Sequence, residues 1–183
     1  LGNPALLMRD EYRELWGDIP IVLCSEENYL GPQETYTKKQ AIATADRTPL
    51  TQLADPYNMV ILYSNLYLDE NIQLICHIVP EIKKFIFIGD ARQINQTNNL
   101  DIRNKLKKTH PNVEYQFITP QDMTTNQLLD SLYFVDPKTT GVLFSSWFYK
   151  TTFAGNTSLV SNAHKLIGTT AAPIFTLSMA DIT

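Results

Sequence analysis

The sequence predicts an α/β fold: a three-layer, doubly wound parallel sheet in residues 65–183, preceded by a partial second lobe in residues 1–64. Two observations lead to this prediction. Residues 83–90 hold a run of large apolar residues between lysines and Gly-Asp, as in a central strand that is covered on both faces. Strand-like and helix-like segments then alternate at intervals of about 25 to 30 residues, as parallel βαβ units require.

The first 64 residues contain one well-marked helix and two strand-like runs. The helix is predicted from Pro4 to Trp16 and ends at Gly17; its apolar stripe is formed by Leu6, Leu7, Tyr12 and Leu15. Strands are predicted at residues 19–24 and 59–63. Between them, periodicity is lost over residues 31–56, apart from one helical turn predicted at 41–45. An incomplete lobe would expose a sheet edge and an apolar helix face, so we expect the chain to form a homodimer.

The remaining segments alternate regularly. Helices are predicted from a cap at Asn65 to Pro80, and over residues 96–108, 119–135 and 156–168. Strands are predicted at residues 85–88, 113–118, 142–145 and 173–178, and polar alternation places the strand at 113–118 nearer an edge. The clearest helical stripe is formed by Leu159, Val160, Ala163, Leu166 and Ile167.

Polar and aromatic residues follow several of the predicted strands. Ligands of open parallel sheets bind outside the carboxyl ends of the strands, which makes residues 89–95 and 146–149 candidates for a binding edge. Their side chains combine flat apolar faces with directional hydrogen-bonding groups, the mixture typical of small-molecule pockets. Two alternatives stay open: Gly89-Asp90 forms only a turn and a helix cap, and Trp147 packs in the core beneath the next helix.

Several functional classes are disfavoured by composition and motifs. A net charge of −4 and a pI near 5.3 argue against nucleic-acid binding, and the basic residues between Arg103 and Lys108 are expected to form a solvated helix face. No phosphate-binding glycine loop or GxSxG elbow occurs, and the histidines lack metal-ligand spacing. We therefore predict ligand binding without catalytic residues, metal or cofactor, and expect Cys24 and Cys76 to be buried thiols.

No apolar run reaches the length of about 18 residues that a membrane span requires. The chain opens on Leu1 without a methionine or a signal peptide. We therefore expect it to be a piece of a longer protein.

The element order and a series of short phrases resemble the periplasmic-binding-protein-like sensor domains of bacterial two-component histidine kinases, which are related to ABC-type substrate-binding proteins. The phrases span most of the chain: Asn3-Pro4-Ala5-Leu6, Asp18-Ile19-Pro20-Ile21-Val22, Glu70-Asn71-Ile72, Pro80-Glu81-Ile82-Lys83-Lys84 leading into Phe87-Ile88-Gly89-Asp90, Val142-Leu143-Phe144 with Ser146-Trp147, and Ala172-Pro173-Ile174-Phe175.

The resemblance implies two lobes that close around a small molecule, with closure relayed through a membrane helix outside this chain to a cytoplasmic kinase. It implies a periplasmic, non-enzymatic domain. The resemblance and the residue types that follow the predicted strands together give the predicted ligand-binding residues: Asn28, Asp90, Arg92, Asn95, Ser146, Trp147 and Tyr149. The alternative functions are a transporter's substrate-binding protein and, from another class, a hydrolase-like or sugar-modifying enzyme that uses Ser146.

Overall fold

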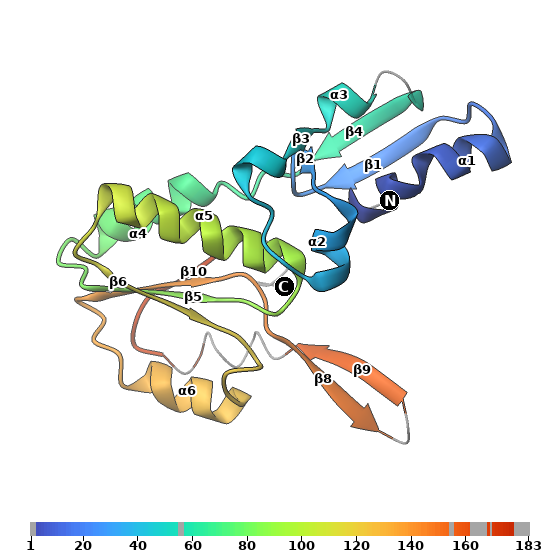
Figure 1. Cartoon of the computed structure of the whole chain (residues 1–183). Helices are drawn as coiled ribbons and strands as arrows, with labels where there is room; N and C mark the ends of the chain where they lie inside the picture. Colours follow the sequence, from blue (N-terminus) through green and yellow to red (C-terminus); the bar gives the residue numbers. More distant parts are fainter. Residues whose placement is uncertain (1–2, 55–56, 154–155, 162–167, 169, 178–183) are drawn as a thin grey trace. The chain divides into compact units, whose positions relative to one another are not determined.

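The computed structural model describes residues 3–54, 57–153, 156–161, 168 and 170–177 of the chain, the stretches 151–153 and 156–161 by their backbone. The protein is a mixed α/β structure with parallel sheets (Figure 1). It forms two compact units, Leu1–Leu66 (unit 1) and Tyr67–Thr183 (unit 2). The predicted division lay at residues 64 and 65.

Unit 1 is built on two short sheets. Strands β1 (Ile21–Ser25) and β4 (Met59–Tyr63) pair in parallel, and β2 (Tyr29–Leu30) pairs antiparallel with β3 (Thr48–Pro49). The remaining elements are the 3-10 helices η1 (Asn3–Met8) and η2 (Thr44–Asp46), and the α-helices α1 (Arg9–Trp16), α2 (Gln33–Lys38) and α3 (Thr51–Ala54). The strand predicted at 59–63 is confirmed.

Two predictions for unit 1 need correction. The first helix is not continuous α-helix, because residues 3–8 are 3-10 helix; Leu6 is buried, whereas Leu15 is 72% exposed. The segment is not irregular over residues 31–54, the part that the structure describes. It folds through tertiary contacts that periodicity does not reveal, such as the fully buried Ile42, whose side chain occupies the space beside Gly31. The predicted turn at 41–45 is displaced to η2.

Within the described residues of unit 1, side chains cover one face of the β1–β4 sheet and the other face is exposed. Leu23 packs with Leu6, Leu30 and Leu50 in the core of unit 1. The alternate residues lie on the opposite face and are exposed, namely Val22, Cys24, Val60 and Leu62. The prediction that Cys24 is buried is therefore wrong, because β1 has only one covered face.

Unit 2 contains a four-stranded sheet with the order β10-β7-β5-β6. The strands are β5 (Lys84–Ile88), β6 (Glu114–Ile118), β7 (Thr140–Phe144) and β10 (Ile174–Thr176), and every pairing is parallel. The sequence-based predictions that β5 is central and that β6 lies at an edge are confirmed.

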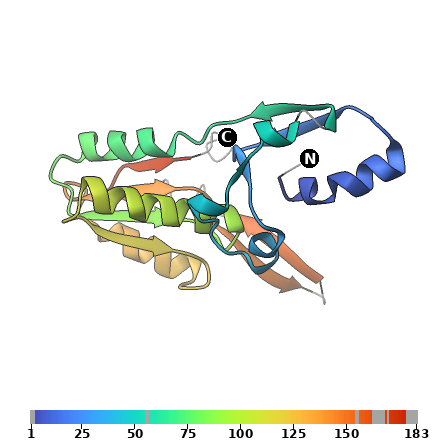
Figure 2. The same ribbon diagram turned by 45° about the horizontal axis from the view of Figure 1, so that its top comes forward.

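Helices cover both faces of this sheet (Figures 1 and 2). Helices α4 (Leu68–Ile78) and α5 (Gln93–Thr109) lie on one face, and α6 (Thr125–Tyr133) lies on the other. Successive side chains of β5 point alternately toward the two helical layers that cover the sheet. Ile86 and Ile88 pack with Leu128 and Leu132 of α6, so Phe85 and Phe87 face the opposite layer.

The helices of unit 2 begin at residues other than those predicted. Helix α4 begins after Tyr67 instead of Asn65, and α5 begins at Gln93, before the predicted residue 96. Helix α6 begins at Thr125 instead of 119, because Thr124 and Gln127 form a reciprocal capping box in which each side chain accepts from the other's backbone N–H.

The helix predicted at residues 156–168 is contradicted over its first six residues. Strand β8 (Phe148–Phe153) pairs antiparallel with β9 (Asn156–Ser161), and Phe153 is opposite Asn156. The sequence from Lys150 to Ser161 is rich in threonine, which favours strands over helices. Ala163, Leu166 and Ile167, the rest of the predicted stripe, lie outside the described residues.

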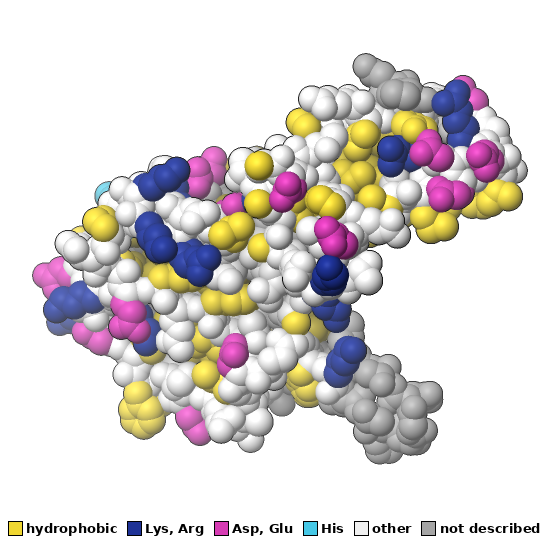
Figure 3. All heavy atoms as spheres, viewed as in Figure 1, with side chains coloured by type: hydrophobic (Ala, Val, Ile, Leu, Met, Phe, Trp, Pro, Cys, Tyr) yellow, Lys and Arg dark blue, Asp and Glu magenta, His cyan; other side chains and the backbone are white. Residues whose placement is uncertain are grey.

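The surface charges are of both signs. On the face shown in Figure 3, lysine and arginine side chains are interspersed with aspartate and glutamate side chains. Within the described residues, no helix is both long and apolar enough to cross a bilayer.

Candidate functional site

The candidate site lies where β5 and β7 end side by side. Ile88, the last residue of β5, is paired with Phe144, the last residue of β7. Gly89-Asp90 therefore emerges next to Ser145-Ser146. Gly89 is closely surrounded, since a Cβ added there would lie 3.1 Å from both the Asn95 and Phe117 side chains. This close packing holds the loop after β5 against the first turn of α5.

A buried carboxylate organises this edge. Asp90 is 1% exposed, and its Oδ1 accepts hydrogen bonds from Arg92 N at 2.8 Å, Arg92 Nε at 2.9 Å and Asn95 Nδ2 at 3.0 Å. Its Oδ2 accepts from Arg92 Nε and Ser146 Oγ, both at 2.8 Å. Five hydrogen bonds thus converge on one side chain.

Asn95 and the two serines complete the network. Asn95 is fully buried; its Nδ2 donates to Ser146 Oγ at 2.8 Å, and its Oδ1 accepts from Ser145 Oγ at 2.7 Å. We call Asp90, Arg92, Asn95, Ser145 and Ser146 the Asp90 cluster. Its buried members satisfy one another, as buried polar groups must if they are not to destabilise the fold.

The hydrogen bonds also set the ionisation of Asp90. Burial by itself would raise the pKa of this carboxyl group, but the hydrogen bonds from Arg92 and Ser146 and the charge of Arg92 outweigh burial, so its pKa lies below the ordinary value. Asp90 is therefore an anion at neutral pH and a weak base.

Arg92 is the most exposed member of the cluster, and Ser145 is half-buried. The Arg92 side chain is 51% exposed, whereas the Asp90 side chain is 2% exposed. The guanidinium carbon lies 4.9 Å from the centroid of the Phe148 ring. Within the described residues, the terminal nitrogens Nη1 and Nη2 donate no hydrogen bond; they lie on the far side of Cζ from the Nε that binds Asp90, and we call this side of the guanidinium its outward edge.

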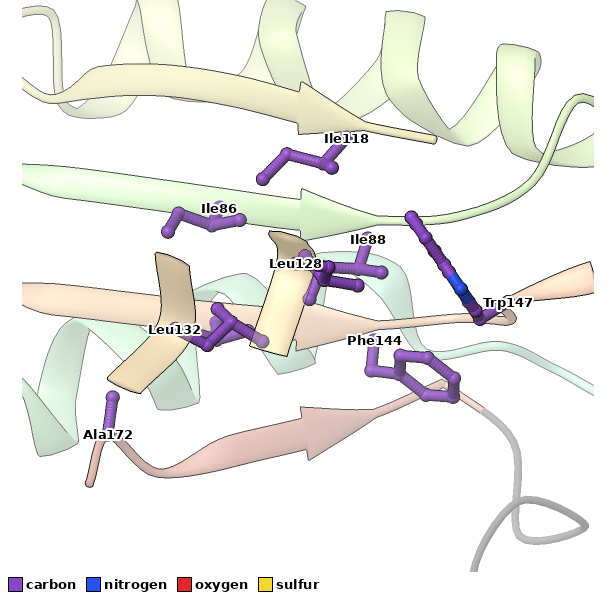
Figure 4. Close-up of a cluster of buried hydrophobic side chains, with 9 residues drawn as sticks. Ile86, Ile88, Ile118, Leu128, Leu132, Phe144, Trp147 and Ala172 are labelled. Atoms are coloured by element: carbon purple, nitrogen blue, oxygen red, sulfur yellow. The ribbon is translucent and has the colours of Figure 1, made fainter. Parts of the chain in front are cut away.

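Trp147 follows the cluster in sequence but lies in the hydrophobic core. It is fully buried among the residues that pack against α6, at the carboxyl end of the strands (Figure 4), and its indole Nε1 donates to Thr125 Oγ1 at 3.0 Å. This placement corresponds to the core-packing alternative, except that the helix concerned is α6, which precedes Trp147 in the chain, and not the helix predicted to follow it. Trp147 does line a pocket together with Tyr149, and this observation supports its prediction as a ligand contact.

That pocket lies beside the start of α6. Its volume is about 370 Å³, and it is lined by Pro120, Met123, Thr124, Thr125, Asn126, Trp147, Tyr149 and Lys150. Tyr149 is partly buried and also packs against the core beneath α6.

Asn28 belongs to unit 1. Its side chain is exposed, and its carbonyl accepts from Leu50 N at 2.9 Å. Nearby, at the carboxyl end of β1, the Asn3 side chain donates to the carbonyls of Glu27 and Tyr29 at 3.1 and 2.8 Å, and Tyr29 Oη donates to Glu27 Oε1 at 2.9 Å. These polar groups hold η1 against the end of β1.

The structure thus gathers Asp90, Arg92, Asn95 and Ser146, and places Trp147 and Tyr149 toward the α6 layer. Sequence reasoning missed Ser145 and Phe148. Phe148 lies within 146–149, the stretch predicted to follow a buried strand, whereas Ser145 was predicted as the last residue of that strand. The end of the strand was therefore the signal that could have found both. Among the described residues, no group of three or more His, Cys, Asp or Glu side chains is arranged to hold a metal ion.

No protein-family model, curated protein or solved structure matches this chain.

Proposed function

We propose that the chain is the extracytoplasmic ligand-binding domain of a membrane-anchored two-component histidine kinase, with unit 2 as a doubly wound lobe of the periplasmic-binding-protein type. The observation that carries this proposal is the Asp90 cluster. Its directional groups converge at the carboxyl edge of a parallel sheet, which is where ligands of such sheets bind. In the periplasm, a small molecule would favour a closed arrangement of the lobes by binding it more tightly than an open one.

The chemistry of the cluster supports binding over catalysis. Ser146 donates its hydroxyl hydrogen to Asp90 and accepts from an amide, and the lowered pKa of Asp90 makes this carboxylate too weak a base to activate the hydroxyl. Asp90 is already an acceptor of five hydrogen bonds, and it is better suited to hold neighbouring groups than to take a proton from a substrate.

A thermal-shift screen of sugars, amino acids and nucleobases tests the proposal. We expect at least one compound to raise the melting temperature of the wild-type protein, because a ligand that binds only the folded state stabilises it. Arg92→Gln should reduce that shift. A screen without any stabilising compound, or a shift that is unchanged in Arg92→Gln, would contradict the proposed site. Turnover of a compound that is abolished in Ser146→Ala would favour an enzyme instead.

We also propose that the chain pairs with a second copy through the uncovered face of the β1–β4 sheet. Parallel sheets are almost always covered on both faces. Here Val22, Val60 and Leu62 are 53%, 59% and 56% exposed, and no charged side chain interrupts this face between them. An uncharged apolar surface is complementary to itself, which favours a second copy as its cover.

Light scattering after size-exclusion chromatography tests the pairing. We expect a concentration-dependent dimer that is weakened when Val60 and Leu62 are both replaced by threonine. Leu74→Thr, at an exposed leucine of α4 in unit 2, is the matched control and should leave the dimer intact. A wild-type monomer at high concentration would exclude the pairing.

A further inference from the structure

We propose that the Asp90 cluster binds a carboxylate group of its ligand through the outward edge of the Arg92 guanidinium. The inference rests on the proposed ligand-binding function and names the class of ligand. It assigns Arg92 as the contact residue, and Asp90, Asn95 and Ser146 as the residues that position it.

The Arg92 side chain is held on two sides before any ligand arrives. Its Nε donates to both oxygens of the buried Asp90 carboxylate, and its guanidinium carbon lies over the Phe148 ring. A long side chain normally loses rotamer freedom when it binds a ligand, and holding it in advance lowers that entropic cost. The outward edge carries Nη1 and Nη2, whose donors are parallel and match the two oxygens of a carboxylate.

The buried members of the cluster are already occupied with one another. Asn95 uses its amide on Asp90 and the two serines, and Ser146 both donates and accepts within the cluster. Asn95 is 0% exposed and Ser146 is 3% exposed. Direct contact with a ligand would therefore break existing buried hydrogen bonds, whereas contact through Arg92 breaks none.

The local charge favours a monoanion. Asp90 and Arg92 form an ion pair with no net charge, and Asn95, Ser146 and the Arg92 backbone N–H also donate to the Asp90 carboxylate. The first turn of α5 carries no acidic residue, and the helix dipole adds a partial positive charge near this pair. A site with so little net positive charge suits the single charge of a carboxylate better than the double charge of a phosphate dianion.

The test is a titration with sodium benzoate, followed through the ¹⁵N chemical shifts of the arginine Nε groups and of the backbone amides of residues 90–95. Benzamide serves as the neutral analogue and inorganic phosphate as the competing oxyanion, at constant ionic strength. We expect saturable shifts with benzoate, weaker binding of phosphate, and no binding of benzamide. Arg92→Gln should weaken benzoate binding by about tenfold or more, as expected when a bidentate charged hydrogen bond is lost.

Two variants make the result specific. Arg92→Lys keeps the charge but lacks the parallel donors, so benzoate binding should stay well below that of the wild type. Arg103→Gln removes the same charge from an exposed position near the other end of α5 and should leave binding unchanged. Folding of each variant is checked from the amide spectrum.

Equal binding of benzoate by the wild type, Arg92→Gln and Arg103→Gln would overturn the inference, as would tighter binding of phosphate or an absence of benzoate binding. If a neutral sugar or nucleobase stabilises the protein while benzoate does not bind, the carboxylate inference fails and the proposed ligand-binding function stands. If no compound of either panel binds, both fail.

Discussion

Replacing Gly141 by alanine is expected to lower the free energy of unfolding of unit 2 by about 3 kcal/mol, the upper part of the range for overpacked cores. Gly141 is a buried residue of β7, and a Cβ built on it would lie 2.3 Å from Ile75 Cγ2 of α4. Real Cβ contacts are essentially never so short, and Ile75 is itself fully buried, so either α4 or β7 has to move.

The change can be measured by urea unfolding followed through tryptophan fluorescence. The chain has two tryptophans, and Trp16→Phe leaves Trp147, in the core of unit 2, as the single reporter. The free energies of unfolding of the variants are then compared in the Trp16→Phe background.

Two substitutions at Ile75 distinguish a local clash from a general loss of packing. Ile75→Leu removes the Cγ2 branch that the new methyl group would meet, and it should recover at least half of the stability lost in Gly141→Ala. Ile75→Val keeps Cγ2 and shortens the other branch, so it should recover little. An equal recovery by both variants, or a Gly141→Ala protein as stable as the wild type, would show that α4 does not approach β7 this closely.

Gly141 also shows what sequence patterns do not reveal. A glycine between Asp136-Pro137 and an apolar run is typical of a turn, and the strand was predicted to begin after it. In the structure the strand begins at Thr140, because the glycine allows α4 to pack closely on β7. The residue that Gly141 meets is Ile75, more than 60 positions away in the chain. The local sequence around Gly141 therefore does not show that the glycine belongs to the strand.

The parallel sheet of unit 2 was predictable because it depends on local patterns. Continuous apolar runs such as Phe85–Ile88 identify strands that are covered on both faces, and the alternation in residues 113–118 identified an edge. The β8–β9 hairpin was not predicted because the apolar residues 159, 160, 163, 166 and 167 are spaced as in a helix, although the threonines at 151, 152 and 157 favour strands. The start of α6 was predictable from Thr124 and Gln127, whose spacing is that of a capping box, although Thr119-Pro120 is also typical of a helix start.

The candidate site was predictable only in part. Strand ends identified Asp90, Arg92, Asn95 and Ser146, since the carboxyl ends of neighbouring parallel strands lie at one edge. The sequence could not distinguish the buried residues of the cluster from the exposed one. Burial of Asp90 and exposure of Arg92, two residues apart, follow from how the loop after β5 folds back to the start of α5.

Replacing Asp90 by alanine is expected to destabilise unit 2 by about 3 kcal/mol, because buried donors lose their acceptor and each unsatisfied group costs about 1 to 3 kcal/mol. Ser146 Oγ, Asn95 Nδ2 and the Arg92 backbone N–H all donate to this carboxylate. The Arg92 side chain contributes less to the loss, because it is half exposed and can be solvated by water. Urea unfolding in the Trp16→Phe background measures the change.

Asp136→Ala is the matched control for this substitution. Asp136 also has a pKa below its ordinary value, through hydrogen bonds from Lys138 N and Thr139 Oγ1, but it is fully exposed. Its donors can turn to water, so its replacement should cost clearly less than that of Asp90. Similar losses for the two variants would mean that Asp90 does not hold a buried network.

Acidification should remove the contribution of Asp90 even without mutation. Burial tends to raise the pKa of this carboxyl group, but the hydrogen bonds and charge of Arg92 and the hydrogen bond of Ser146 bring it below the ordinary value of 3.8. A group whose pKa is lowered by folding stabilises the protein fully above its unfolded-state pKa, and this stabilisation disappears as the pH falls through the folded-state pKa. The wild type should therefore lose more stability than Asp90→Asn between about pH 7 and about pH 3, since the amide does not titrate. Parallel losses in the two proteins would show that the Asp90 carboxylate is not held as an anion by its neighbours.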